Sequence, residues 1–448
     1  MLRQVRRAVE LTPPERDRYV DLLRALAITM VVLGHWLVVA VTYSDDDGLD
    51  GFSALATVPW SRPLTWLFQV MPLFFLVGGY VNGASFDGRR RDGGDAAGWL
   101  LRRAGRLLGP TTVFVVTVAG CALVARLLGA DPELVGTAGW LVAIPLWFLT
   151  AYLVVVVLTP LLYPLHRRAG WLVVAVLVGG VAVADTARFA FDVEQVAYAN
   201  YLLVWLAVHQ VGFLWRDGRL PGRTGAAVLT VAALLVLLWC TVVGPYPVSM
   251  VTVPGEEVQN TAPPTLALLS LAATQTGLAL LLRPPVERWL RGRRPWTLVV
   301  AVNLVALTVF LWHMAAVVVA AGVLYPPGLL PQPAVGSAEW LLWRVPWLGC
   351  LLVVLLVLVL VFSPAERGLP LPRGAEDTAE GRGAGGVRLR GVRPAVTCVG
   401  LGLAVAGLLG ITVSGPEDHG PFGLPGAALL AYLVGIGALW LLPRGRAD

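Results

Sequence analysis

The stretch 21-DLLRALAITMVVLGHW-36 decides the fold, because it reads as a membrane-spanning helix that also carries an arginine, Arg24, and a histidine, His35. A helix needs about 20 mostly apolar residues to cross a bilayer. Ionisable side chains inside such a segment are costly, so they usually face the interior of a helix bundle or a water-filled cavity. The stretch therefore predicts a first membrane span with a functional face.

Arg24 and His35 are predicted to share that face. An α-helix turns about 100° per residue, which brings the two positions within about 20° of each other and roughly 16 Å apart along the axis. Arg24 could instead extend to the lipid headgroups, helped by Asp21 one turn earlier, and His35 could be a neutral imidazole bonded to a neighbouring helix. The functional alternative for His35 is a general base, because imidazole can take a proton from a hydroxyl near neutral pH.

The composition is that of a membrane protein. Hydrophobic residues make up 57% of the 448 residues and charged residues 14%, against roughly 45–50% and 25% in soluble domains. All 34 basic residues are arginine, and they occur in short clusters between apolar runs. This distribution argues against a nucleic-acid partner, which would require a continuous basic face. The four cysteines have no paired spacing, so neither a disulfide nor a metal site is expected.

Apolar windows of membrane-spanning length predict an all-α, polytopic integral membrane protein. The fifth window is the weakest, because it is short and rich in glycine. The twelve predicted spans are 20–43, 64–85, 107–130, 140–164, 170–187, 196–215, 225–244, 264–283, 297–324, 340–362, 395–413 and 424–442.

The spans predict four parts of the chain. A cytoplasmic N-terminal segment covers 1–19, and a ten-helix membrane domain covers 20–362. Residues 363–394 are polar and rich in Gly, Pro and Arg, so we expect a flexible cytoplasmic linker there. A two-helix membrane addition covers 395–448.

The arginine clusters also predict the orientation, since short cytoplasmic loops carry excess Lys and Arg. If the N-terminus is in the cytoplasm, most arginine clusters lie in cytoplasmic loops. The loops on the other side of the membrane, the outside loops, carry acidic runs such as Glu256-Glu257. We therefore expect a multi-pass protein of the plasma membrane with both termini cytoplasmic. The arginines expected in outside loops are Arg62, Arg126, Arg188 and Arg344.

Two further polar stretches interrupt the apolar pattern. In 71-MPLFFLVGGYVNG-83, Gly78-Gly79 and Asn82 lie in the second span, where close helix packing is the simpler interpretation. In 101-LRRAGRLLGP-110, Arg103 and Arg106 lie one turn apart, with Arg102 beside them. Two guanidiniums at this spacing can converge on one phosphate group, although spacing alone favours ordinary charge near the headgroups.

Histidines occur in two other spans. His313, in 310-FLWHM-314, is expected at a depth similar to that of His35, so both could face one cavity. For His209, in 205-WLAVHQVGF-213, a structural hydrogen bond is the preferred interpretation. His166 is expected in a loop.

Taken together, these motifs resemble the acyltransferase-3 family of integral-membrane acyltransferases. The family carries an Arg-x10-His motif in its first helix, which corresponds here to Arg24 and His35. MPLFFLVGGY resembles the second-helix signature, RRAGRLLGP the Arg-x-x-Arg motif, WFLTAYLVVVVLTPLLY a later span, and FLWHM the aromatic-x-His motif. The resemblance covers about residues 15–365.

The resemblance implies a membrane domain that moves an acyl group, acetyl or another short one, from a cytoplasmic acyl-CoA to a hydroxyl of a carbohydrate, glycolipid or secondary-metabolite acceptor. Acyl-CoA would be a co-substrate, with no tightly bound cofactor and no metal. His35 would be the catalytic base, and Arg24 would hold the donor or orient the site. Donor phosphates would bind to Arg103 and Arg106, assisted by Arg102. Asp21, Asn82 and His313 would support the site or line its cavity.

Two other functions stay open at this point. Many spans with buried histidine and arginine also suit a transporter or flippase for a small polar or lipid-linked substrate, although no repeat relates two halves of the chain. The third alternative is a structural membrane subunit. The placement of polar residues at set depths argues against it.

Overall fold

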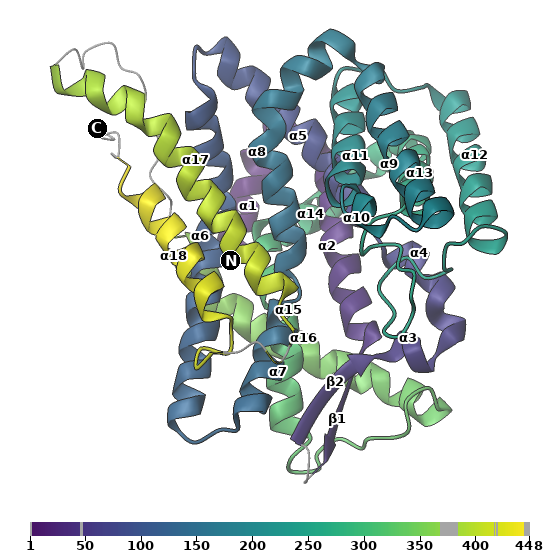
Figure 1. Ribbon diagram of the computed structural model, residues 1–448, viewed down its shortest axis with the longest axis vertical. Helices are drawn as coiled ribbons and strands as arrows, with labels where there is room; N and C mark the ends of the chain where they lie inside the picture. The colour runs from purple at the N-terminus through teal and green to yellow at the C-terminus, as the bar shows by residue number, and fades with distance from the viewer. Residues whose placement is uncertain (1, 45–47, 368–383, 416, 418–419, 443–448) are drawn as a thin grey trace. The chain divides into compact units, whose positions relative to one another are not determined.

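The computed structural model describes residues 2–44, 48–367, 384–415, 417 and 420–442 (Figure 1). The described chain is almost entirely helical, with one two-stranded sheet. Eleven of the helices described are long and apolar enough to cross a membrane. The protein is therefore an all-α, multi-pass membrane protein, as its sequence predicts.

The elements follow one another in the chain as labelled in Figure 1. They are α1 (Leu2–Glu10), α2 (Arg18–Val38), β1 (Val39–Ser44), β2 (Gly48–Ser53), α3 (Ala54–Thr57), η1 (Pro59–Leu64), α4 (Thr65–Phe68), α5 (Met71–Arg91), α6 (Ala96–Leu127), α7 (Pro132–Ala143), α8 (Leu146–Ala169), α9 (Trp171–Phe191), α10 (Glu194–Ala197), α11 (Asn200–Arg216), α12 (Arg223–Val242), α13 (Leu266–Leu290), α14 (Arg293–Leu304), α15 (Ala306–Leu324), α16 (Ala338–Arg367), α17 (Ala384–Val413) and α18 (Gly426–Trp440).

The predicted spans correspond to helices, with differences at their ends. The weak fifth span is a continuous helix, α9, of 21 residues. The twelfth is α18, which at 15 residues is shorter than the candidate spans. The first span ends at Val38 rather than near residue 43, because the β-branched and aromatic run 39–44 pairs with β2 as a strand.

The predicted ninth span, 297–324, is two helices rather than one. α14 ends at Leu304, and Val305 leaves helical geometry with φ −118° and ψ 9° before α15 begins. No glycine or proline marks the break, so the apolar pattern could not reveal it. The predicted linker 363–394 is shortened from both sides, because α16 continues to Arg367 and α17 starts at Ala384. The part between them, 368–383, lies outside the described residues.

The helices group into two compact units. The first unit comprises 1–38, 53–84 and 159–306. Within it, α2 packs against α13 and α14, and α12 packs along α13. The N-terminal helix α1 rests on α14, where the indole of Trp296 donates to the Thr12 hydroxyl at 3.2 Å.

Two glycines bring α5 and α11 of the first unit into close backbone contact. A Cβ on Gly79 would lie 2.0 Å from the carbonyl oxygen of His209, and one on Gly212 would lie 2.2 Å from that of Leu76. Small residues allow membrane helices to approach in this way. Gly79 therefore has the packing role that the sequence suggests.

The second unit comprises 39–52, 85–158 and 307–448. In it, α6 packs against α7, α16, α17 and α18. The aromatic ring of Trp312 on α15 stacks on Phe362 of α16, with centroids 3.8 Å apart, and meets Phe114 of α6 edge-on at 5.1 Å. The helices α17 and α18 lie side by side (Figure 1), and a Cβ on Gly407 would be 2.4 Å from the backbone nitrogen of Tyr432.

Candidate functional site

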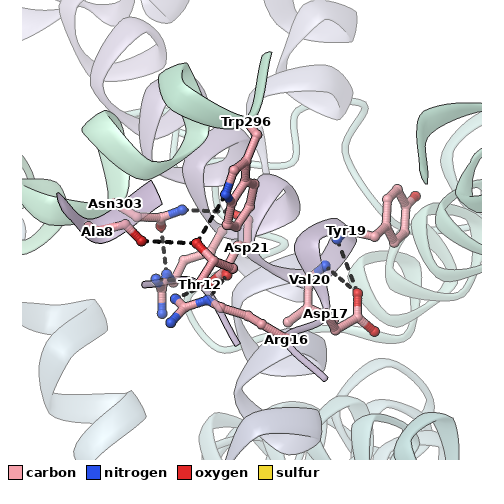
Figure 2. Close-up of polar contacts among 10 residues, drawn as sticks. Ala8, Thr12, Arg16, Asp17, Tyr19, Val20, Asp21, Trp296 and Asn303 are labelled. Carbon is pink, nitrogen blue, oxygen red and sulfur yellow. Dashed lines mark hydrogen bonds and ion pairs between the residues drawn. The ribbon is translucent and has the colours of Figure 1, made fainter. Parts of the chain in front are cut away.

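Helix α2 carries both Arg24 and His35 without interruption. Its first turn is capped by Asp17, whose Oδ1 accepts from the backbone N–H groups of Tyr19 and Val20 at 3.1 Å (Figure 2). The other carboxylate oxygen of Asp17 accepts from Tyr80 on α5 at 3.0 Å and from Arg283 on α13 at 2.8 Å. The start of α2 is thus fixed to two neighbouring helices of its own unit.

The guanidinium of Arg24 is held by Asp21 and by Asn303 of α14. Its Nε donates to Asn303 Oδ1 at 2.7 Å, and its Nη2 donates to Asp21 Oδ1 at 3.2 Å. Asn303 also donates from Nδ2 to the backbone carbonyl of Asp21 at 2.9 Å. Arg24 is therefore held by one hydrogen bond to α14 and by one to Asp21 of its own helix.

Asp21 is the centre of this cluster, since it is 7% exposed and pairs with two arginines. Figure 2 shows the side chains of Arg16 and Asn303 pointing toward it. The hydrogen bond to Asp21 raises the pKa of Arg16. The sequence prediction that Asp21 lies near Arg24 agrees with this arrangement, whereas Asn303 was not identified from the sequence.

His35 is half-buried, and its own helix sets its tautomer. Nδ1 lies 3.0 Å from the carbonyl oxygen of Val31, one turn earlier. A carbonyl can only accept, so Nδ1 carries the proton in this contact and the lone pair of the neutral ring is on Nε2. This is the form of histidine that can accept a proton.

Asn82 lies on α5 and is fully buried. Its Nδ2 donates to Nε2 of His209 on α11 at 3.1 Å, next to the glycine contact between these helices. The pair joins α5 to α11. His209 thus makes the kind of hydrogen bond that the sequence suggests for it.

The three arginines predicted to bind phosphate lie on α6. Arg103 is half-buried and donates from Nη2 to the Tyr152 hydroxyl of α8 at 3.2 Å, and its buried Nε has no hydrogen-bond partner among the described residues. Arg106, one turn later, is exposed, and Arg102 is half-buried. This turn of α6 therefore presents unsatisfied and solvent-facing guanidinium donors, which suit an anionic group.

His313 is fully buried on α15. Its Nδ1 lies 2.6 Å from the carbonyl oxygen of Phe310, which places the lone pair of the neutral ring on Nε2, as in His35. His313 and the α6 arginines belong to the second unit, whereas Arg24, His35, Asp21 and Asn82 belong to the first.

Arg344 and His166, which the sequence places in loops, lie in helices, as Arg126 and Arg188 do. Arg344 lies in α16 and is 8% exposed; it donates to the carbonyl of Val39 at 2.7 Å and covers the ring of Trp340 at 4.2 Å. His166 lies near the end of α8, with Nε2 3.1 Å from the carboxylate of Asp217. Both side chains make tertiary contacts, which a hydropathy pattern does not record.

A buried carboxylate on α9 was also missed from the sequence. Asp185 accepts from Asn200 Nδ2 at 2.8 Å, from the Tyr246 hydroxyl at 2.9 Å and from the backbone N–H of Leu266 at 2.7 Å. An aspartate inside an apolar run was the available signal. Its contacts are structural, because they join α9 to α11, to the segment before α13 and to α13 itself.

Among the residues that the structure describes, no group of three or more His, Cys, Asp or Glu side chains could hold a metal ion.

Comparison with known proteins identifies the class of enzyme. A family model described as an acyltransferase domain matches residues 17–363, which is most of the chain and includes every candidate site residue named above. Searches of curated proteins and of solved structures found no match. The match begins at the capping residue of α2 and ends within α16. The chain belongs to the acyltransferase-3 family and is a membrane acyltransferase.

Proposed function

We propose that the protein transfers a short acyl group, such as acetyl, from a cytoplasmic acyl-CoA to a hydroxyl of a carbohydrate, glycolipid or secondary-metabolite acceptor. The observation that carries this proposal is the contact between Nδ1 of His35 and the carbonyl oxygen of Val31 at 3.0 Å, from which we assign the proton to Nδ1 and the lone pair to Nε2. The family match favours acyl transfer over the transporter or flippase alternative.

The reaction is a direct transfer with His35 as general base. Nε2 of His35 takes the proton of the acceptor hydroxyl while the oxygen of that hydroxyl attacks the thioester carbon of the acyl-CoA. The new carbon–oxygen bond forms, the carbon–sulfur bond breaks, and the thiolate of coenzyme A leaves. The imidazolium then returns its proton to this thiolate, so the base is restored without a covalent intermediate on the protein.

Arginines supply the positive charge in the proposed mechanism. Arg24, oriented by Asp21 and Asn303, holds the donor or stabilises charge near the reacting group. Arg103 and Arg106 bind the donor's phosphates through bidentate hydrogen bonds, assisted by Arg102. The buried Nε of Arg103, which lacks a partner among the described residues, supports this role.

The remaining residues support the site. Asp21 orients Arg24, and Asn82 and His313 each support the residues of their own unit. Acyl-CoA is a co-substrate, and no tightly bound cofactor takes part.

We place the protein in the plasma membrane with both termini in the cytoplasm. In this orientation, segment 1–19 and linker 363–394 are cytoplasmic, and the ten-helix domain 20–362 carries the chemistry. The clusters of arginine at one end of the predicted spans support this topology.

The experiment uses a strain that lacks the native gene and expresses the wild type or His35→Gln. Lipid, glycan and metabolite extracts are compared by mass spectrometry for one lost acyl mass. We expect the acylated product with wild type and its loss with the variant at equal protein levels. His166→Gln, which replaces a histidine held by Asp217, is the matched control and should keep the product. Full acylation by His35→Gln would disprove the proposed base.

A further inference from the structure

The helix pair α17 and α18 lies beyond the family match, which ends at residue 363. Within the second unit the pair packs against α6, the helix that carries the three arginines. The segment between α17 and α18 also packs closely on α7, because a Cβ on Gly139 of α7 would lie 2.0 Å from the carbonyl oxygen of Gly423. Gly423 itself has a φ of +61°, which favours glycine.

Helix α6 is weakened where it meets this pair. Pro110 lies inside the helix and has no N–H, so it cannot donate to the carbonyl of Arg106, four residues earlier. The hydroxyls of the next two residues bond to other carbonyls of the helix. Thr111 donates to the carbonyl of Leu107 at 2.8 Å, and Thr112 donates to that of Leu108 at 2.7 Å.

Tyr432 of α18 contacts this turn of α6. It is fully buried, and its hydroxyl lies 2.9 Å from Thr112 Oγ1 and 3.4 Å from the carbonyl oxygen of Leu108. Because Thr112 gives its proton to Leu108, its oxygen accepts from Tyr432. The absence of a side chain at Gly407 lets α17 pack directly on the backbone of Tyr432. The C-terminal helix pair thus contacts the turn of α6 that contains Pro110 through one hydrogen-bond donor, the hydroxyl of Tyr432.

We propose that the C-terminal helix pair positions the arginines of α6 for the donor by bracing the proline turn through Tyr432 and Thr112. The inference rests on the proposed donor-binding role of Arg103 and Arg106. Both arginines precede Pro110 within two turns, so loosening of this turn changes the direction of the segment that carries them. Tyr432 and Thr112 are positioning residues and act only through α6.

The test uses the full chain in membrane vesicles from a strain lacking the native gene, with labelled acetyl-CoA as the donor probe. Tyr432→Phe and Thr112→Val remove the contact. Each should raise the apparent KM for acetyl-CoA about 3–10-fold, the effect of one lost hydrogen bond, with kcat within about twofold of wild type. Thr112→Ser keeps the hydroxyl and should restore the wild-type KM.

Thr111→Val is the matched control. It removes a threonine hydroxyl from the same turn, but the bond that it loses is to Leu107 within α6. Its KM should stay close to that of the wild type. Hydrogen exchange followed by mass spectrometry gives a readout that does not depend on activity. Exchange in the peptide 100–112 should be faster in Tyr432→Phe and unchanged in Thr111→Val.

The outcomes separate the two proposals. If Arg103→Ala or Arg106→Ala raises KM but Tyr432→Phe and Thr112→Val do not, the bracing role is overturned and the donor site stands. If both arginine variants leave KM unchanged, the donor site is overturned, whatever the tyrosine variant does. If Thr111→Val raises KM as much as Thr112→Val, the effect belongs to α6 alone and the role of the C-terminal pair is overturned.

Discussion

Asn303 and Arg24 are joined by a side-chain hydrogen bond of 2.7 Å between Oδ1 and Nε. The same amide donates to the backbone carbonyl of Asp21 at 2.9 Å, so one residue of α14 holds both the arginine and the backbone one turn before it. This arrangement fixes the direction of the Arg24 guanidinium relative to α2. A hydrogen bond to a charged group is worth about 1.5–3 kcal/mol, enough to favour one orientation of this side chain.

Replacing Asn303 should therefore impair acyl transfer. Asn303→Leu has a similar size but neither hydrogen bond, and we expect its transfer rate to fall about 10-fold or more. Asn303→Asp keeps an oxygen that can accept a hydrogen bond from Arg24, so its transfer rate should fall less than that of Asn303→Leu. Initial rates with labelled acetyl-CoA, normalised to protein level, measure both. Thr297→Val, on the same helix, loses a bond only to the carbonyl of Arg293 and is the control. Equal rates for Asn303→Leu and this control would exclude the orienting role.

A conservative change at Tyr152 tests the setting of Arg103. Tyr152→Phe removes the hydroxyl that accepts from Arg103 Nη2 at 3.2 Å. We expect the apparent KM for acetyl-CoA to rise about 3–10-fold, because the guanidinium loses one of the contacts that orient it. Phe148→Leu changes the neighbouring ring, whose centroid is 5.8 Å from that of Tyr152, without removing a hydroxyl. If both variants raise KM equally, packing rather than the hydrogen bond is responsible.

The contact between α5 and α11 makes Gly79 sensitive to substitution. An added Cβ would lie 2.0 Å from the carbonyl oxygen of His209, so Gly79→Ala must separate the helices. We expect a loss of about 1–3 kcal/mol in the free energy of unfolding, measured by thermal denaturation in detergent. Gly120→Ala, on α6, meets open space and should not destabilise the protein. A wild-type melting temperature for Gly79→Ala would mean that the helices do not approach so closely.

Tyr246 should make stability fall at alkaline pH. Burial raises the pKa of its hydroxyl, with a smaller contribution from the charge of Asp185. The proton is thus bound more tightly in the folded state, and this stabilisation is present below the unfolded pKa of about 10. This stabilisation is lost as the pH rises through the raised pKa of Tyr246 in the folded state. Between pH of about 9 and 11 the melting temperature of the wild type should fall more steeply than that of Tyr246→Phe. If the melting temperatures of the wild type and of Tyr246→Phe fall equally over this pH range, the pKa of Tyr246 is not the cause.

The sequence was sufficient for the class of fold and for the span that carries Arg24 and His35. Hydropathy and the arginine clusters predict helices of membrane length, and these depend on local composition. The break at Val305 has no helix-breaking signal, since the residues around it are free of glycine and proline. Its position is therefore set by tertiary packing.

The sequence predicts the candidate site residues and their spacing along single helices. The motif identifies Arg24, His35, Arg103 and Arg106, because each stands out as a polar residue in or beside an apolar run. Their partners do not stand out in the same way. Asn303 is 279 residues from Arg24 in the chain, and Tyr152 is 49 from Arg103. Such pairings depend on how distant helices meet, which spacing along one helix cannot specify.

The carbonyl that fixes the His35 ring belongs to Val31, on the same helix. The contact that assigns the ring proton to Nδ1 is consequently made within five consecutive residues of α2. In the mechanism that we propose, a mutation on a neighbouring helix that leaves this contact in place can change the space for the acyl acceptor. Preference for the acyl acceptor can then change while the proposed base is kept.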